Sequence, residues 1–165
     1  MKRLMQGLTV LCLWVFSGCG TGLEAENSPG GGATQGVIVP GQGLSELKLG
    51  DPYSRATQLY GPGLHSYMSL NGSYSHRIDY FALGLALRFN NTEASIKDDS
   101  KIAAIEISGP SNRKTEKGIG VGSKLDEVKG VYGTPKTSST FFGDVYENGL
   151  VFEYEDGVVT RIVIR

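Results

Sequence analysis

A repeated pattern in the second part of the chain constrains its fold more than any other feature. Residues 49–61 align without a gap with residues 121–133, which pairs Gly50 with Gly122. Both segments contain an apolar residue and a glycine, a polar residue, an apolar stripe at helical spacing, Tyr-Gly, and a proline soon after. A pattern of this length, repeated in register, indicates two copies of one supersecondary unit.

Two further matches follow the first in the same order along the chain. Residues 84–89 resemble 149–154, and residues 105–107 resemble 162–164, while the loops between them differ in length. Loops of a duplicated unit can vary because they run over the surface, whereas the elements that they connect must pack. The two expected units span about 44–109 and 117–165.

Each unit is expected to begin with a short helix. In the first unit, Asp51 is placed to cap the helix and Pro52 to occupy its first position. In the second unit, Ser123 and Asp126 have the spacing of a capping box. The glycine of each Tyr-Gly pair would end the helix in a left-handed conformation. Helices of about nine residues are marginal in isolation, so we expect both to pack against a sheet.

Alternating side chains after each helix predict antiparallel strands. Residues 85–89 and 150–154 alternate in the same way, and Glu155-Asp156-Gly157 is a hairpin signal that leads into residues 158–164. A unit of about 60 residues barely buries its own surface, which favours two units joined through one sheet. The expected fold class is therefore α+β, with a short helix and about three antiparallel strands in each unit.

The pattern Gly-x-x-x-x-x-Val-x-x-x-Tyr-Gly-x-Pro, followed by a hairpin, resembles a known group of proteins. This group comprises the SmpA/OmlA class of small outer-membrane lipoproteins and the tandem-repeat β-lactamase-inhibitor-protein fold. Gly122, Val128, Tyr132-Gly133 and Pro135 carry the resemblance, and the first copy matches more loosely, with Ala56 in place of valine. Members of those groups bind proteins. The resemblance therefore implies a protein-binding module over about residues 44–165.

The N-terminus has the anatomy of an export signal. Two basic residues precede an apolar run over 8–16, and small residues then lead to Cys19. A signal that stops at a cysteine resembles the bacterial lipoprotein type, in which the thiol is acylated and the cysteine becomes the first residue of the mature chain. Phe16 departs from that pattern, which prefers Leu, Val or Ile at this place. We expect residues 1–18 to be a signal peptide and Cys19 to anchor the protein to a membrane.

Two other interpretations of this segment remain open, a transmembrane anchor and a plain secretory signal in which Cys19 is incidental. A spanning helix needs roughly 20 apolar residues, and the run here is shorter and is followed by glycines and polar residues. Residues 19–43 are expected to form the lipidated cysteine and a flexible, glycine-rich tether. Within the tether, Val37-Ile38-Val39 is either a short strand or unstructured.

Charge and cysteine content exclude some classes of function. The chain has a formal net charge of −1 and no basic stripe, and loss of Lys2 and Arg3 with the signal would make it more acidic. This balance argues against nucleic-acid binding. The two cysteines are Cys12 inside the expected signal and the expected lipidation site, so no disulfide framework is predicted.

The sequence contains no recognisable catalytic or metal-binding pattern. Its two histidines, His65 and His76, lie in a stretch, 64–77, that we interpret as a polar and aromatic loop. A zinc site would need further ligands at set spacings, and the glycine-rich stretch 118–122 lacks the Lys-Ser/Thr ending of a phosphate loop. We therefore expect no enzymatic activity, no cofactor and no metal site.

Aromatic residues outside the predicted core are the remaining candidates for a binding site. Tyr67 and Tyr74 lie in the first copy, and Phe141, Phe142 and Tyr146 lie at a comparable place in the second. Exposed aromatic side chains are enriched in binding hot spots. Strand residues of this kind also pack across a sheet, and that alternative remains open.

Two functional hypotheses follow from these features. In the first, a lipid-anchored protein of the bacterial envelope, at the outer membrane or the periplasmic face, binds an envelope protein through its sheet face. Its role would be envelope assembly or inhibition of an exported enzyme. In the second, the anchored protein binds a small ligand or a cell-wall glycan and uses its aromatic rings as stacking platforms.

Overall fold

The structure, a computed structural model, describes residues 36–91, 93–140 and 143–165. The chain divides into two units, and the described residues all belong to the second, Ala33–Arg165. Cys19, Phe141 and Phe142 lie outside the described residues, as do the expected signal peptide and most of the expected tether.

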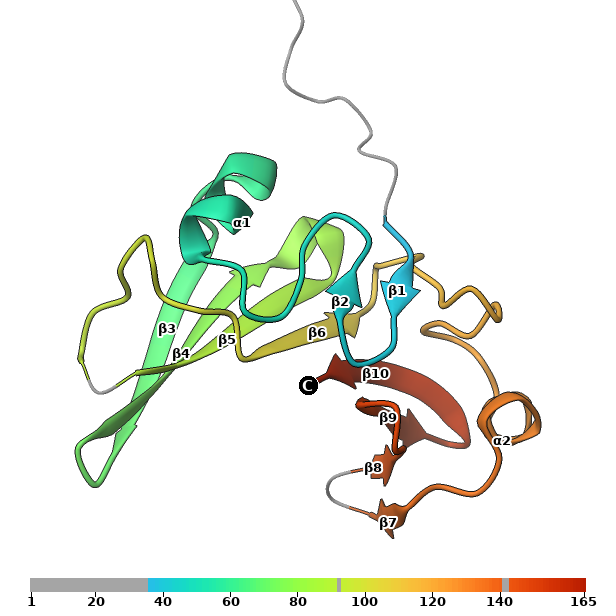
Figure 1. The fold of residues 1–165 in the computed structure, drawn as a ribbon. Coiled ribbons are helices and arrows are strands. Elements are labelled where there is room, and N and C mark those ends of the chain that lie inside the picture. Colours follow the sequence, from blue (N-terminus) through green and yellow to red (C-terminus); the bar gives the residue numbers. More distant parts are fainter. Residues whose placement is uncertain (1–35, 92, 141–142) are drawn as a thin grey trace, which may run out of the picture. The chain divides into compact units, whose positions relative to one another are not determined.

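Eight strands of the described region form one antiparallel sheet in the order β3-β4-β5-β6-β10-β9-β8-β7, and β1 and β2 form a separate hairpin (Figure 1). The helices are α1 (Tyr53–Tyr60) and α2 (Leu125–Tyr132), with a 3-10 turn at Phe81–Leu83. The strands are β1 (Ile38–Val39), β2 (Gly43–Leu44), β3 (Leu64–Leu70), β4 (Ser73–Tyr80), β5 (Leu85–Asn91), β6 (Ala104–Ser108), β7 (Thr137–Ser139), β8 (Gly143–Val145), β9 (Leu150–Glu155) and β10 (Val158–Ile164).

The fold class is α+β, as the sequence predicts. Within the described residues each helix is followed by four strands rather than about three, because α1 precedes β3–β6 and α2 precedes β7–β10. The last strand of each segment, β6 or β10, pairs with the other at the centre of the sheet. Both segments therefore share one sheet.

Each helix begins one residue later than predicted, because the cap positions are Pro52 and Lys124 rather than Asp51 and Ser123. The Asp51 carboxylate accepts a hydrogen bond from the Lys48 N–H at 2.8 Å, and the Ser123 hydroxyl accepts one from the Gly120 N–H at 3.1 Å. Both polar side chains thus stabilise the turn before a helix and cap no helix. The glycines of the two Tyr-Gly pairs end the helices, as predicted, at φ of 82° and 77°, a region that favours glycine. Their ψ values of −171° and −151° lie outside the left-handed helical conformation that the sequence predicts.

One face of the sheet carries the core, and both helices pack on it. Ala56 of α1 and Val128 of α2 are fully buried. The ring of Tyr53 meets Phe89 edge-on at 5.7 Å between centroids, and Tyr132 lies 5.7 Å from Phe152. The β1–β2 hairpin covers the same face between the two helices, over the central strands (Figure 1).

The folded region begins earlier than residue 44, which corrects the expected boundary of the tether. Ile38 and Leu44 are fully buried, and the Ile38 N–H donates to the Lys114 carbonyl at 2.9 Å. Of the two alternatives left open for 37–39, the strand is therefore the one observed. Burial of these two apolar side chains offsets the entropy of ordering a glycine-rich hairpin.

Candidate functional site

The stretch interpreted as a polar and aromatic loop is a β-hairpin, which corrects that prediction. β3 pairs with β4 along its full length. The two residues between the strands, Asn71 and Gly72, have φ of 50° and 79°, as in a type I′ turn. Asn-Gly between two strand-like segments is a strong hairpin signal, so this strand pair could have been found from the sequence.

β3 forms one edge of the sheet, and all of its side chains are exposed. The exposed fractions of Leu64, Tyr67, Met68 and Leu70 are 60%, 55%, 73% and 75%. We call these four side chains the hairpin surface. Strand alternation places Tyr67 on one face and the other three on the opposite face. On that opposite face Met68 and Leu70 are neighbours, two positions apart along the strand. Adjacent exposed apolar side chains of this kind mark interaction sites, whereas scattered ones do not.

A cluster of four rings lies on the Tyr67 side of the hairpin. Tyr67 of β3 and Tyr74 of β4, two of the predicted site residues, have ring centroids 6.0 Å apart. His65 and His76 complete the cluster, with a centroid separation of 5.2 Å between the two imidazoles. Aromatic pairs attract one another at these separations, so cross-strand packing holds the cluster together.

The two histidines form a hydrogen-bonded relay. His76 is fully buried, with Nε2 2.9 Å from the Glu93 carbonyl oxygen and Nδ1 2.9 Å from His65 Nε2. Because a carbonyl oxygen can only accept, His76 Nε2 carries a proton, and in the neutral pair His76 Nδ1 accepts from His65 Nε2–H. Burial and the neighbouring imidazole lower the pKa of His65. His65 is therefore favoured in its neutral form.

We expect His65 to lower the free energy of unfolding as the pH falls below 6.5, the ordinary pKa of histidine. Because its pKa is lowered in the folded state, the unfolded chain binds the proton first, and stability present above that pH is lost below it. His65→Asn should remove this part of the pH dependence. Urea denaturation of wild type and His65→Asn between about pH 7.5 and 5.5 measures how the free energy of unfolding depends on pH. The same pH dependence in both proteins would contradict the expectation.

Tyr146, another predicted site residue, belongs to the core and is not a surface residue. It is 5% exposed, and its ring lies 5.7 Å from Tyr132 and 5.6 Å from Phe152. Tyr80 has the same relation to the first helix, because its buried ring lies 5.4 Å from Tyr60. For Tyr146 the packing alternative is therefore the one observed.

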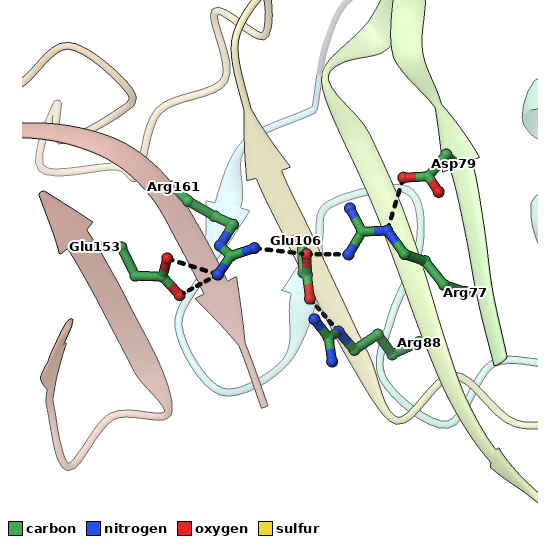
Figure 2. Close-up of polar contacts among 6 residues, drawn as sticks. All are labelled: Arg77, Asp79, Arg88, Glu106, Glu153 and Arg161. Carbon is green, nitrogen blue, oxygen red and sulfur yellow. Dashed lines mark hydrogen bonds and ion pairs between the residues drawn. The ribbon is translucent and has the colours of Figure 1, made fainter. Parts of the chain in front are cut away.

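The second face of the sheet carries an ionic network at its centre (Figure 2). Glu106 of β6 is 3% exposed, and its two carboxylate oxygens accept from Arg77 Nη1 at 2.5 Å and from Arg88 Nε. Arg161 Nη1 lies 3.7 Å from the same carboxylate. The outer ion pairs of the network are Arg77–Asp79 and Arg161–Glu153.

This network braces the sheet and presents a charge-balanced surface. Burial raises the pKa of Glu106, but the hydrogen bonds and charges of Arg77 and Arg88 outweigh that effect and hold it below its ordinary value. The members come from β4, β5, β6, β10 and β9, so the network connects neighbouring strands across the middle of the sheet. No local sequence pattern predicts the network, because its members are distant in sequence.

Within the described ranges, no group of three or more His, Cys, Asp or Glu side chains could hold a metal ion. No helix in that part of the chain is long and apolar enough to cross a membrane. Comparison of the chain with protein-family models, with curated proteins and with solved structures found no match. Any functional assignment must therefore come from the site itself.

Proposed function

We propose that this chain is a lipid-anchored protein of the bacterial envelope that binds another protein and catalyses no reaction. The observation that supports it best is the hairpin surface, in which Leu64, Met68 and Leu70 are each more than half exposed beside Tyr67 on an edge strand. Covering an apolar side chain of this size contributes about 1.5–3 kcal/mol. By binding a partner through this surface, the chain would either take part in envelope assembly or inhibit an exported enzyme.

We also infer that the α1–β6 and α2–β10 segments are two copies of one unit. Strand register supports the inference, because the residues that align in sequence also occupy equivalent pairs in the sheet. The equivalent pairs are Leu85↔Ile107 with Leu150↔Ile164, and Leu87↔Ile105 with Phe152↔Ile162. The central β6–β10 pairing is symmetric about Glu106↔Val163, with an isoleucine pair on each side. A two-fold relation between two copies would produce this arrangement.

The binding function is tested by capturing partners with the tagged full chain from detergent-solubilised envelopes. Met68→Ser combined with Leu70→Ser should weaken capture more than tenfold, since each covered side chain contributes at least about 1.4 kcal/mol, which is tenfold in affinity. Phe81→Ser is the matched control, because Phe81 is 68% exposed and lies outside the hairpin surface. Undiminished capture by the double variant, or equal loss in the control, would contradict the proposal.

The anchor has its own test in the Cys19→Ala variant. We expect this variant to incorporate no labelled palmitate and to leave the membrane fraction, because each buried methylene of an acyl chain contributes about 0.8 kcal/mol. Cys12→Ala is the control and should be labelled and retained like the wild type. Labelling of Cys19→Ala at the wild-type level would show that the acyl chains are attached elsewhere and would contradict the assignment of Cys19.

A second candidate function is binding of a cell-wall glycan or a small ligand. The adjacent rings of exposed Tyr67 and half-buried Tyr74 favour it, since neighbouring rings on one face can stack against a sugar. In a peptidoglycan sedimentation assay, Tyr67→Ala with Tyr74→Ala should then abolish binding, while Met68→Ser with Leu70→Ser should not. Capture of a protein that depends on Met68 and Leu70, without glycan binding, would favour the first function instead.

A further inference from the structure

The outer edge of β3 is a template for another strand. β3 is seven residues long, whereas β7 at the other edge has three. Natural edge strands block pairing with charged side chains, proline or bulges. β3 has no lysine, arginine, acidic residue or proline, and its pairing with β4 shows no register shift. Nothing within this strand therefore opposes the addition of a further strand.

The turn determines which backbone groups of β3 face outward. Residues that flank a two-residue turn form a hydrogen-bonded pair, and here these are Leu70 and Ser73. Hydrogen-bonded and non-hydrogen-bonded pairs alternate along antiparallel strands. The N–H and C=O groups of His65, Tyr67 and Ser69 consequently point away from β4, toward the free edge.

The two ends of β3 match about Tyr67, although the positions between them do not. The strand reads Leu-His-Ser-Tyr-Met-Ser-Leu, with Leu64 and Leu70 at its two ends. A two-fold axis at Tyr67 would place each of these leucines opposite the other in an antiparallel partner, and each His65 opposite a Ser69. The same axis pairs all three residues whose backbone groups face outward, and each such pair exchanges two hydrogen bonds. An axis at another residue would leave one end of the strand without a partner.

We propose that β3 pairs antiparallel with β3 of a second copy of this chain, around a two-fold axis at Tyr67. This inference rests on the proposed binding function, and it identifies a second copy of the chain as the occupant of the free edge of β3. Pairing would continue the sheet from one copy into the other and place Leu64, Met68 and Leu70 of both copies on one face. Because the strand carries no formally charged side chain, two copies approach without like-charge repulsion between the strands.

A single cysteine at the axis tests the register. In the full chain in membranes of expressing cells, Tyr67→Cys should form a disulfide-linked dimer on mild oxidation. The two Cα atoms of a hydrogen-bonded pair lie about 5.5 Å apart, a distance that a disulfide can bridge. His65→Cys and Ser69→Cys, each alone, lie about 13 Å from their own copies and should give several-fold less dimer. Wild-type protein sets the background from Cys12 and Cys19.

The proposal also predicts that Ser69→Pro lowers the dimer yield of the Tyr67→Cys protein several-fold. Proline removes an N–H that faces the free edge, so the β3–β4 hydrogen bonds remain. An unchanged circular dichroism spectrum would verify that the variant is folded. Equal dimer yields from cysteines at 65, 67 and 69, or no effect of Ser69→Pro in a folded protein, would overturn the proposal.

The two proposals fail in different ways. If Tyr67→Cys gives no dimer while Met68 and Leu70 still determine capture of another protein, self-pairing is wrong and the binding function stands. If Tyr67→Cys gives the dimer but no other protein is captured, self-pairing is supported and binding of a different envelope protein is wrong.

Discussion

Replacing Phe152 with alanine should lower the free energy of unfolding by about 3–5 kcal/mol. Phe152 of β9 is fully buried, and its ring packs against Tyr132 of α2 and Tyr146. Truncation would leave a cavity lined by two aromatic rings whose positions are set by a helix and the sheet. Such a cavity collapses only partly, so the loss should lie above the cost of hydrophobic transfer alone.

Chemical denaturation followed by circular dichroism measures this loss, and Phe81→Ala is its control. Phe81 is the same residue type but is 68% exposed. Its truncation should therefore change the free energy of unfolding by no more than about 0.5 kcal/mol. Similar losses in the two variants would show that Phe152 does not join α2 to the sheet as described.

Glu106→Gln should lower the free energy of unfolding by about 2–3 kcal/mol. Breaking a fully buried ion pair costs about 3–5 kcal/mol, because it leaves an uncompensated charge. Here the buried partner is Glu106, while Arg77, Arg88 and Arg161 keep about a third or more of their side chains exposed, which reduces the cost. Glutamine retains the shape of the side chain but directs an N–H group toward arginine donors.

The same substitution should change the acid dependence of stability. The pKa of Glu106 is lowered in the folded state from its ordinary 4.5, so its contribution is fully present above that pH. It is lost as the pH falls through the folded-state pKa, because the unfolded chain binds the proton first. The difference between wild type and Glu106→Gln should therefore shrink in acid.

Denaturation midpoints at neutral and acidic pH measure both effects of Glu106→Gln. Glu147→Gln is the matched control, because Glu147 is exposed and its removal should change stability by less than about 0.5 kcal/mol. A loss in Glu106→Gln that is no larger than in the control, or that grows in acid, would contradict the description of the network.

The sequence predicts the two helices and the turn before β10, because each depends on residues that lie close together along the chain. The helical apolar stripes place Ala56 and Val128 in the core. The predicted turn before β10 is present, with Asp156 and Gly157 at φ of 51° and 75°. Each of these features depends on residues a few positions apart, which hydrophobic periodicity and turn chemistry report directly.

The ionic network and the burial of Tyr146 are not predicted from the sequence, because both depend on which strands become neighbours in the sheet. The ionic network joins Glu106 to arginines that lie far away in sequence, and nothing near each arginine marks its partner. Tyr146 resembles the hairpin tyrosines in sequence. Only its ring contacts with Tyr132 of α2 and Phe152 of β9 show that it is buried. The β3–β4 hairpin differs from these features, because Asn71-Gly72 between two strand-like segments is a local signal for it.

The most direct test of the binding function is photo-crosslinking from the hairpin surface in intact cells. A photoreactive amino acid in place of Met68, which is 73% exposed, should form a discrete adduct with another protein in the full, membrane-bound chain. The same probe in place of Phe81 should not form that adduct. Absence of an adduct from Met68, or the same adduct from both positions, would contradict the assignment of the hairpin surface as the binding site.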